Sequence, residues 1–404
     1  MAFSTMFITD ILRGIDWGEA ASFGATPGSF SALVKADQVV ASLTKEVIER
    51  AVQTTQPMRG PAPSLIGRHT GKINFVLPMR GGALVAGGTA ESEICQLLSN
   101  MGLARHNVAA GVAKVTGGSS TTITMLDADA TDMVVGGWVA AGTNAGDDVQ
   151  VRPIIRVEAS GGTTTVTVGC PWATTPVNGW DIHPLDYLIP ADGEPTKYLG
   201  IDLYQGGDAT YRHKYRALGC AGTWKIPTAK IGSLPMVEFE INVSQFSESE
   251  ANRSDEEDLY SEAQTLMLAD SLYFGATQID TDSIAFDPGL DLVEMPGQSG
   301  ANDQGRIGWW YKQAVPKLEI LPYWDSEWPT LRDAGTTEEA VYVNEGGADQ
   351  FWGVCIFKTQ VVDVGQEALS NGMLAAKPSL IACNPHINDD SDELPLYSIC
   401  LSGV

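Results

Sequence analysis

A glycine- and lysine-containing stretch near residue 70 is the first candidate for chemistry. It reads Gly67-Arg68-His69-Thr70-Gly71-Lys72, with three residues between its glycines and Ile73 after the lysine. A phosphate-binding loop has four residues there and a Ser or Thr after the lysine, because the backbone must wrap the phosphates while the hydroxyl holds Mg²⁺. The alternation of Ile73, Phe75 and Leu77 indicates a strand, whereas such a loop opens a helix. We therefore expect a turn that leads into a sheet, and no nucleotide chemistry.

Acidic pairs and triplets are the second kind of candidate. Asp127, Asp129 and Asp132 are spaced like part of a calcium loop, but Asp132 occupies the glycine position and no glutamate closes the loop. Glu238 and Glu240 lie two apart on an expected strand. A glycosidase needs its two acids on opposing elements, which this spacing does not provide. We expect solvent-facing turn acids at Asp127, Asp129 and Asp132, and a structural rather than a catalytic role for Glu238 and Glu240.

Histidine, cysteine and serine patterns complete this search. The five histidines are far apart, and the six cysteines include no CxxC pair, so neither a zinc site nor a disulfide framework is expected. The cysteines fit small buried hydrophobic residues. A Gly-x-Ser-x-Gly hydrolase elbow is absent from the sequence. The sequence predicts a protein that is not an enzyme, with no catalytic residue, cofactor or metal.

The charge balance limits the partners. The 404 residues include 25 basic and 50 acidic side chains, giving a net charge of -25. Nucleic-acid binding depends on basic side chains that displace counterions, so tight DNA binding is disfavoured. An acidic surface can still lie beside DNA and let it pass. The acidic N-terminal stretch does not fit a signal peptide, and no apolar run is long enough to span a bilayer, so we expect a soluble protein without a membrane partner.

The elements that must position these residues are mostly strands, because Gly, Thr, Val and Pro are plentiful and helical periodicity is scarce. One helix is expected over 89–102, with apolar residues at i, i+3, i+4 and i+7 and Gly102 at its end. Residues 37–52 fit a helix or an extended arm. Residues 216–246 predict a hairpin whose second arm alternates apolar and polar residues.

The remaining segments are assigned from composition. The acidic segment 247–262 fits a solvated loop or short helix, while 307–324 and 350–365 are strand candidates. The end, 384–404, fits an acidic tail that is ordered only against neighbours. Residues 114–192 form an expected β insertion, in which "GGSSTTITM" and "SGGTTTVTV" are either a duplication or two similar Thr-rich hairpins.

The order of segments resembles the major tail tube protein of long, flexible-tailed (non-contractile) bacteriophages. The resemblance is carried by "GRHTGKINFVLPMRGG" with the helix "ESEICQLLSNMGL", and then by "YLGIDLYQGGDATYRHKYRALGCAGTWKI" with "GSLPMVEFEINVSQF". It covers about 66–102 and 198–246, and the final third fits more loosely. It implies an N-terminal arm and the first part of the sandwich in 1–113, the inserted module in 114–192, and the rest of the sandwich with its tail in 193–404.

The resemblance also implies an architecture and a role. The fold would be a tail-tube-type antiparallel β-sandwich with a flanking α-helix, and six copies would form a ring that closes exposed strand edges. Stacked rings would form a tail tube in the virion, assembled in the host cytoplasm with other phage tail proteins, through which double-stranded DNA passes transiently without specific binding. The residues implied to face the lumen are Glu238, Glu240, Asn242 and Asn74, and those implied to contact the next ring are Arg68 and Lys72.

Other interpretations remain open. The two glutamates of the hairpin can instead face outward to solvent. A tube protein of a related gene-transfer or secretion particle would share the same sequence features. A carbohydrate-binding β-sandwich protein is the main alternative, in which aromatic side chains form a stacking platform from Trp309, Trp310, Trp324, Trp328 and Trp352.

Overall fold

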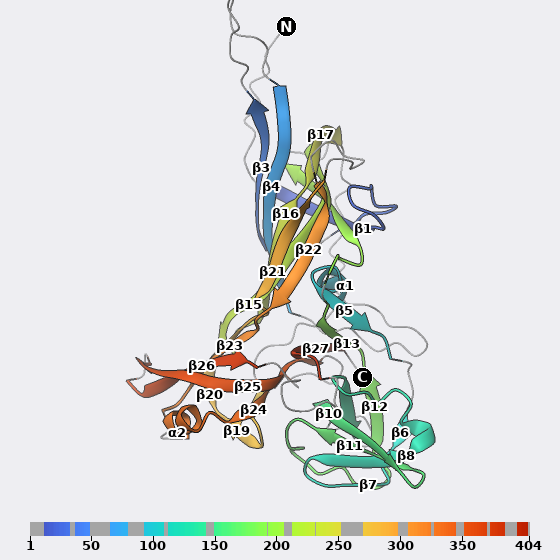
Figure 1. The fold of residues 1–404 in the computed structure, drawn as a ribbon, viewed down its shortest axis with the longest axis vertical. Coiled ribbons are helices and arrows are strands. Elements are labelled where there is room, and N and C mark those ends of the chain that lie inside the picture. Colours follow the sequence, from blue (N-terminus) through green and yellow to red (C-terminus); the bar gives the residue numbers. More distant parts are fainter. Residues whose placement is uncertain are drawn as a thin grey trace, which may run out of the picture.

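The computed structural model describes residues 12–32, 37–48, 65–79, 93–108, 112–142, 149–191, 193–205, 212–230, 232–251, 270–297, 306–324, 327–344, 351–369, 372–383 and 394–402. Antiparallel strands dominate these residues, which confirms the mainly β prediction. Two α-helices lie among them, α1 (Glu93–Ser99) and α2 (Glu327–Ala334). The molecule is elongated, with a β-sandwich at the upper end of Figure 1 and a broader β body at the lower end.

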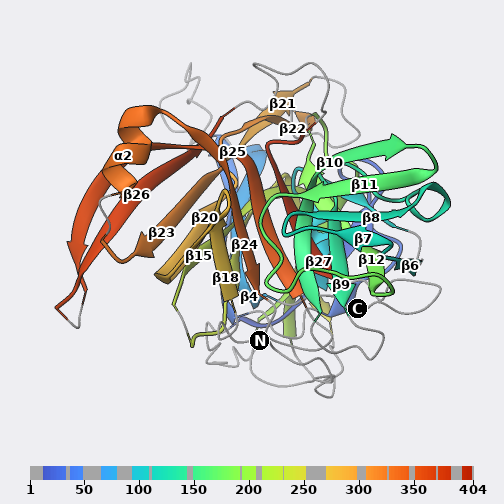
Figure 2. The same cartoon turned by 90° about the horizontal axis from the view of Figure 1, so that it is seen from below.

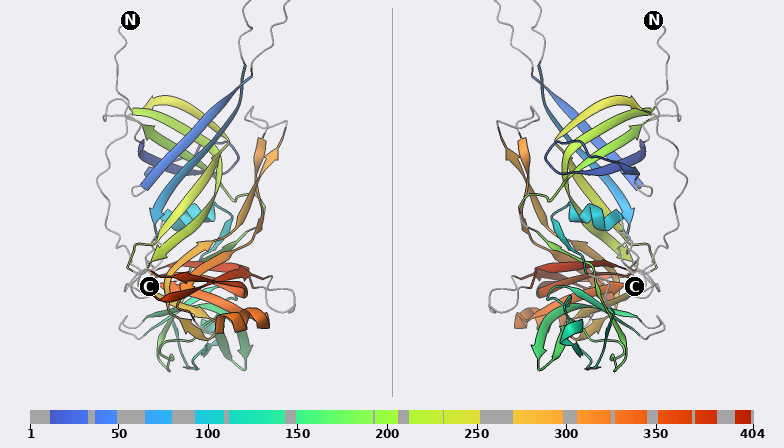
Figure 3. Two further views of the ribbon diagram at one scale, coloured as in Figure 1. Left: turned by 90° about the vertical axis from the view of Figure 1, so that its left-hand side faces the viewer. Right: turned by 90° about the vertical axis from the view of Figure 1, so that its right-hand side faces the viewer.

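The upper β-sandwich consists of two sheets that share one strand. The first sheet contains β1 (Leu12–Ala20), β2 (Ser31–Ala32), β14 (Tyr198–Gln205), β15 (Arg212–Lys230) and β17 (Gln245–Ala251). The second sheet contains β3 (Asp37–Ile48), β4 (Leu65–Pro78), β16 (Met236–Val243) and the middle of β15. Figure 3 shows both sheets from two sides.

Strand β15 connects the sandwich to the lower body. Residues 212–218 pair with β17, 221–225 pair with β16, and its last residues pair with β20 (Thr281–Asp287). Gly219 lies between the first two pairings with φ +61°, a conformation that glycine adopts without steric cost. The strand therefore turns from one sheet into the other at this residue.

Helix α1 closes the core of the sandwich. Its apolar residues Ile94, Leu97 and Leu98 are buried in one cluster with Phe75 of β4. Gly102, with φ +78°, lies just after the helix, where a left-handed residue commonly ends a helix. The predicted helix is thus confirmed over 93–99, and its expected first residues lie outside the described part of the chain.

The lower body is built around the long strand β25 (Phe351–Ala368). Along one edge it pairs with β24 (Thr337–Asn344), and along the other with β26 (Leu374–Ala382) and β27 (Tyr397–Ser402). The same sheet also contains β5 (Leu103–His106), β13 (Tyr187–Pro190), β18 (Asp270–Phe274), β19 (Thr277–Ile279), β20 and β23 (Lys317–Pro322). A separate hairpin, β21 (Leu290–Pro296) and β22 (Arg306–Ala314), stands beside the sandwich (Figure 3).

Residues 113–185 contain a separate seven-stranded sheet with its own core. Its strands are β6 (Ala113–Lys114), β7 (Gly117–Gly118), β8 (Thr122–Leu126), β9 (Trp138–Gly142), β10 (Gln150–Ser160), β11 (Thr163–Val168) and β12 (Asp181–Leu185). The two Thr-rich segments contribute β8 and β11, which pair directly. Figure 2 shows this module on one side of the body. The indole N–H of Trp138 donates to the Ser398 hydroxyl of β27 at 2.8 Å and joins the two parts.

Several expectations about local structure are wrong. The stretch 67–72 is not a turn but part of β4, which pairs with β3 at residues 69–72 and with β16 from Gly71 onward. Residues 247–251 are the end of β17 rather than a solvated loop or short helix. Of the two alternatives for residues 37–52, the extended one holds over 37–48, which form strand β3. The rest of 247–262 lies outside the described residues.

The expectation of a tail ordered only against neighbours is also wrong for residues 397–402. These residues form β27, a central strand between β25 and β13, in which Tyr397, Ile399 and Cys400 are fully buried. Their burial inside the same chain supplies the ordering that the sequence seemed to require from another copy.

Candidate functional site: a charge-paired sheet face

The candidate site is the outer face of the sheet that contains β4, β16 and the middle of β15. On β16 the apolar side chains of Val237, Phe239, Ile241 and Val243 are buried, and the phenyl ring of Phe239 stacks on Phe75 with 5.0 Å between centroids. The other face therefore carries Glu238, Glu240 and Asn242, because successive residues of a strand point to opposite sides. The predicted alternation of this hairpin arm is confirmed.

The strand register brings the sequence-predicted residues together. Glu240 lies opposite Asn74, and Asn242 lies opposite Lys72, so these four residues share one face of two neighbouring strands. Glu238 lies opposite Lys225 of β15. Whether this face lines a channel stays a prediction, since a single chain does not contain the neighbouring copies.

Each glutamate of this face is paired with a lysine. Lys225 Nζ lies 2.8 Å from Glu238 Oε2, and Lys72 forms an ion pair with Glu240. The hydrogen bond from Lys225 to Glu238 raises the pKa of the ammonium group, with further contributions from the charges of Asp287 and Glu240. Both pairs are largely exposed, and such pairs contribute only about 0–1 kcal/mol each. Their main effect is to compensate charge on this face.

A groove of about 590 Å³ lies on this face. Its polar lining includes Asn74, Lys225, Glu238, Glu240 and Asp287. Lys72 reaches Glu240 from beside it, so three carboxylates and two ammonium groups leave the face with one net negative charge. The groove is thus weakly acidic, rather than densely anionic as the strand alone suggested.

Strand β3 forms the outer border of the groove. Gln38 has φ +51°, which is uncommon for a non-glycine residue, and it lies in a β-bulge where the register of β3 and β4 shifts. Val40, two residues on, is 60% exposed and lines the groove. In the described residues β3 is paired only with β4, so its second edge carries backbone groups that no described strand engages.

The hairpin of β21 and β22 covers the other end of the face. The hydroxyl of Tyr311 donates to Gly222 O at 2.7 Å, and the indole N–H of Trp309 donates to Gly219 O at 2.8 Å. Ala221, opposite Asn242, is buried in the same cluster as Trp309. The covered end explains why Asn242 is half-buried and does not line the groove.

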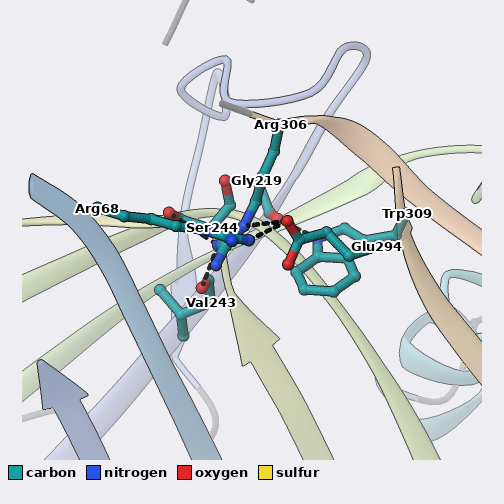
Figure 4. A network of polar contacts seen from close by, with 7 residues as sticks. All are labelled: Arg68, Gly219, Val243, Ser244, Glu294, Arg306 and Trp309. Carbon is teal, nitrogen blue, oxygen red and sulfur yellow. Dashed lines mark hydrogen bonds and ion pairs between the residues drawn. The ribbon is translucent and has the colours of Figure 1, made fainter. Parts of the chain in front are cut away.

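An ion cluster fixes this hairpin to the sandwich (Figure 4). Glu294 of β21 forms ion pairs with Arg68 of β4 and with Arg306 of β22, the latter at 3.1 Å from Nε to Oε1. Arg306 is 3% exposed, and its Nη1 donates to Val243 O and Ser244 O at 3.2 Å each. Burial lowers the pKa of Arg306, and this effect is opposed by the charge of Glu294.

The structure thus places the two expected inter-ring residues differently. Arg68 is half-buried in the Glu294 cluster of its own chain, while Lys72 is more exposed and pairs with Glu240. A contact of either residue with a further copy stays a prediction. Sequence analysis did not find Arg306, Glu294 or Lys225. The Lys225–Glu238 pair could have been found from the sequence, because the two residues lie on opposite arms of the predicted hairpin. No pattern in the sequence indicates that Glu294 meets Arg68.

The other sequence candidates do not assemble into a reactive centre. Asp127 and Asp129 lie in a short 3-10 helix, and Asp127 accepts a hydrogen bond from Thr164 at 2.7 Å. Within the described residues no group of three or more His, Cys, Asp or Glu side chains could hold a metal ion. Five of the six cysteines are buried, as expected for small apolar residues, and Cys383 is half-buried.

The five tryptophans of the carbohydrate interpretation do not form one platform. Trp309, Trp328 and Trp352 are buried in clusters of the core, while Trp310 is exposed on β22. Trp324 is half-buried in the lower body. Trp324 and Trp328 line a common groove.

Comparisons with known proteins give no assignment, because no protein-family model matches the sequence and no curated protein is significantly similar to it. Among the described residues no helix is long and apolar enough to cross a membrane. The site itself offers paired charges, an open strand edge and a polar groove.

Proposed function

We propose that the protein is a structural subunit of a phage tail tube, in which six copies form a ring and stacked rings form a hollow tube for double-stranded DNA. The observation that carries this proposal is the open edge of the twelve-residue strand β3, next to a polar sheet face. A long unpaired edge templates pairing with another chain, and a closed ring of copies is a stable way to satisfy it.

The second edge of the sandwich gives the ring its complementary surface. Strand β17 is paired only with β15 among the described residues, so the sandwich has an open strand at an edge of each sheet. A head-to-tail contact that joins two different edges repeats around an axis and closes when the rotation matches the number of subunits. An isologous dimer would satisfy only one of the two edges.

The charge of the chain fits passage of DNA without retention. The net charge of -25 repels the DNA backbone, and the lysines on the proposed channel face are paired with glutamates. Binding to DNA gains free energy from counterions released by basic side chains, and paired lysines on an acidic protein provide little of it. We propose that Glu238, Glu240 and Asn74 line the bore, while other tail proteins bind the ends of the tube.

Negative-stain electron microscopy of the purified full chain, combined with light scattering of the same sample, tests this function. We expect rings of six copies and hollow tubes, and no retention of linear duplex DNA in a gel-shift assay at low salt. A protein that stays monomeric across protein concentration, pH and salt contradicts the proposal. A densely cationic bore in a map of the assembled tube contradicts it as well.

A further inference from the structure

A second groove lies in the lower body, away from the charge-paired face. It has a volume of about 480 Å³ and lies between α2, the β18–β19 hairpin and the end of β23. Small-ligand sites usually measure about 300–1,000 Å³, so the groove is large enough for one or two sugar rings. None of its lining residues belongs to the sheet face that carries the proposed tube function.

The floor of this groove is aromatic and held in place. Trp328 of α2 is buried and packs against Phe274 of β18, with 6.1 Å between the ring centroids. The backbone of Trp324 donates to Leu374 O at 3.0 Å, and Tyr323 forms an isolated β-bridge with Ala375. Tyr323 is nevertheless 46% exposed. Its ring is therefore a flat apolar surface open to solvent, carried by a backbone that these pairings hold in place.

The rim of the groove consists of hydrogen-bonding side chains. Gln278 and Asp280 are exposed at the β18–β19 hairpin, and Glu327 lies at the start of α2. Carboxylates accept hydrogen bonds from hydroxyl groups, and an amide both donates and accepts. No lysine or arginine is among the residues that line the groove, so a phosphate or carboxylate ligand would meet only like charge.

The aromatic geometry distinguishes between a cation and a neutral ligand. A quaternary ammonium group is bound best when several ring faces surround it. Here Phe274 and Trp328 are buried against each other and Trp324 is half-buried, which leaves Tyr323 as the most exposed aromatic residue of the lining. One flat apolar face beside several hydroxyl-binding groups matches a sugar ring, which has an apolar C–H face and a hydroxylated perimeter.

We propose that this groove is a binding site for a neutral saccharide. The C–H face of a pyranose ring stacks on Tyr323, and its hydroxyl groups donate to Asp280 and Glu327. The side-chain amide of Gln278 donates to a ring or hydroxyl oxygen. The site does not depend on the proposed tube function, because it is built entirely within one lower body.

The experiment is a neutral-glycan array probed with the purified full chain, followed by calorimetric titration of the strongest hit. We expect saturable binding and at least a tenfold loss of affinity in Tyr323→Ala, because that variant removes the stacking face. Asp280→Asn is expected to weaken binding several-fold, since the amide is a poorer acceptor. Near-ultraviolet circular dichroism of each variant checks that the fold is retained.

The matched control is Trp310→Ala. Trp310 is 44% exposed on β22 and contributes no lining atom to the groove, so its loss should leave the affinity unchanged. The proposal is overturned if no neutral glycan binds, if Trp310→Ala abolishes binding, or if tetramethylammonium binds more tightly than every glycan. Electron microscopy of the same samples measures tube formation separately. Absence of glycan binding would therefore overturn the saccharide site without contradicting the tube proposal.

Discussion

Lys225 Nζ lies 2.8 Å from Glu238 Oε2, directly across the ladder that joins β15 to β16. Together with the ion pair of Lys72 and Glu240, this contact converts an acidic strand face into a nearly balanced one. A balanced, hydrated face has two advantages in the proposed tube. It offers DNA no unpaired cations to bind, and it avoids the repulsion that a ring of uncompensated glutamates would create between copies.

Reversal of charge at Lys72 should weaken tube growth. Lys72→Glu removes the partner of Glu240 and places two like charges side by side, at a residue that the tail-tube resemblance implies to contact the next ring. Mean tube length, measured by negative-stain microscopy, is expected to fall several-fold. Lys317→Glu, at an exposed lysine of β23, is the control and should leave it unchanged. Tubes of normal length in Lys72→Glu would argue against a role for this face in stacking.

A charge on the open edge strand should prevent ring closure. Val40→Lys adds an exposed ammonium group to β3, where charged side chains disfavour pairing with another strand. The new lysine lies in the groove near Glu238 and Glu240, so the fold of the single chain should be retained. Light scattering is expected to show monomers for Val40→Lys and rings for the control Val177→Lys, a similarly exposed position in the inserted module. Rings in both variants would exclude the β3 edge as the contact.

The Arg306 cluster should contribute measurably to stability. Arg306→Met removes a buried guanidinium that binds two backbone carbonyls and Glu294, and we expect the free energy of unfolding to fall by about 2–3 kcal/mol. Arg156→Met breaks the exposed pair with Glu158 and should cost about 0–1 kcal/mol. Urea titrations followed by fluorescence give both values. If the free energy of unfolding falls equally in the two variants, burial of Arg306 does not determine how much its ion pair contributes to stability.

Acidification should loosen the junction of β4 with β17. His69 Nδ1 accepts a hydrogen bond from Phe246 N at 3.5 Å, which requires that nitrogen to be unprotonated. Burial, and then the charge of Lys45, lower the pKa of His69 below 6.5. As the pH falls through about 6.5, the unfolded chain therefore takes up a proton before the folded chain does, and the folded state loses stability until the folded pKa is passed.

The measurement for this junction is the melting temperature between pH 8 and pH 5.5. We expect it to decrease on acidification in the wild type and to decrease less in His69→Gln, which has no charge to gain. His386→Gln, a substitution far along the sequence, serves as the control. If the melting temperatures of the wild type and His69→Gln change identically with pH, His69 is not the group responsible for the loss of stability.

The sequence alone predicted an element correctly where the element buries one face and its apolar residues repeat with the matching period. The alternation of Val237 and Phe239 with Glu238 and Glu240 fixed which side of β16 is buried, because a strand buried on one face tolerates no shift of one residue. The helix at 93–99 followed from apolar spacing in the same way.

Only the tertiary structure decided the partners of these side chains. Glu294 and Arg68 are 226 residues apart, and no local pattern records that they meet. Residues 397–402 looked like an acidic tail but fill a central strand position between β25 and β13. Periodicity reports how a residue relates to its own strand, whereas ion pairing and strand order depend on segments that only the folded chain brings together. The local sequence therefore determined which face of β16 is buried. The tertiary structure decided which lysines balance the charge of its exposed face.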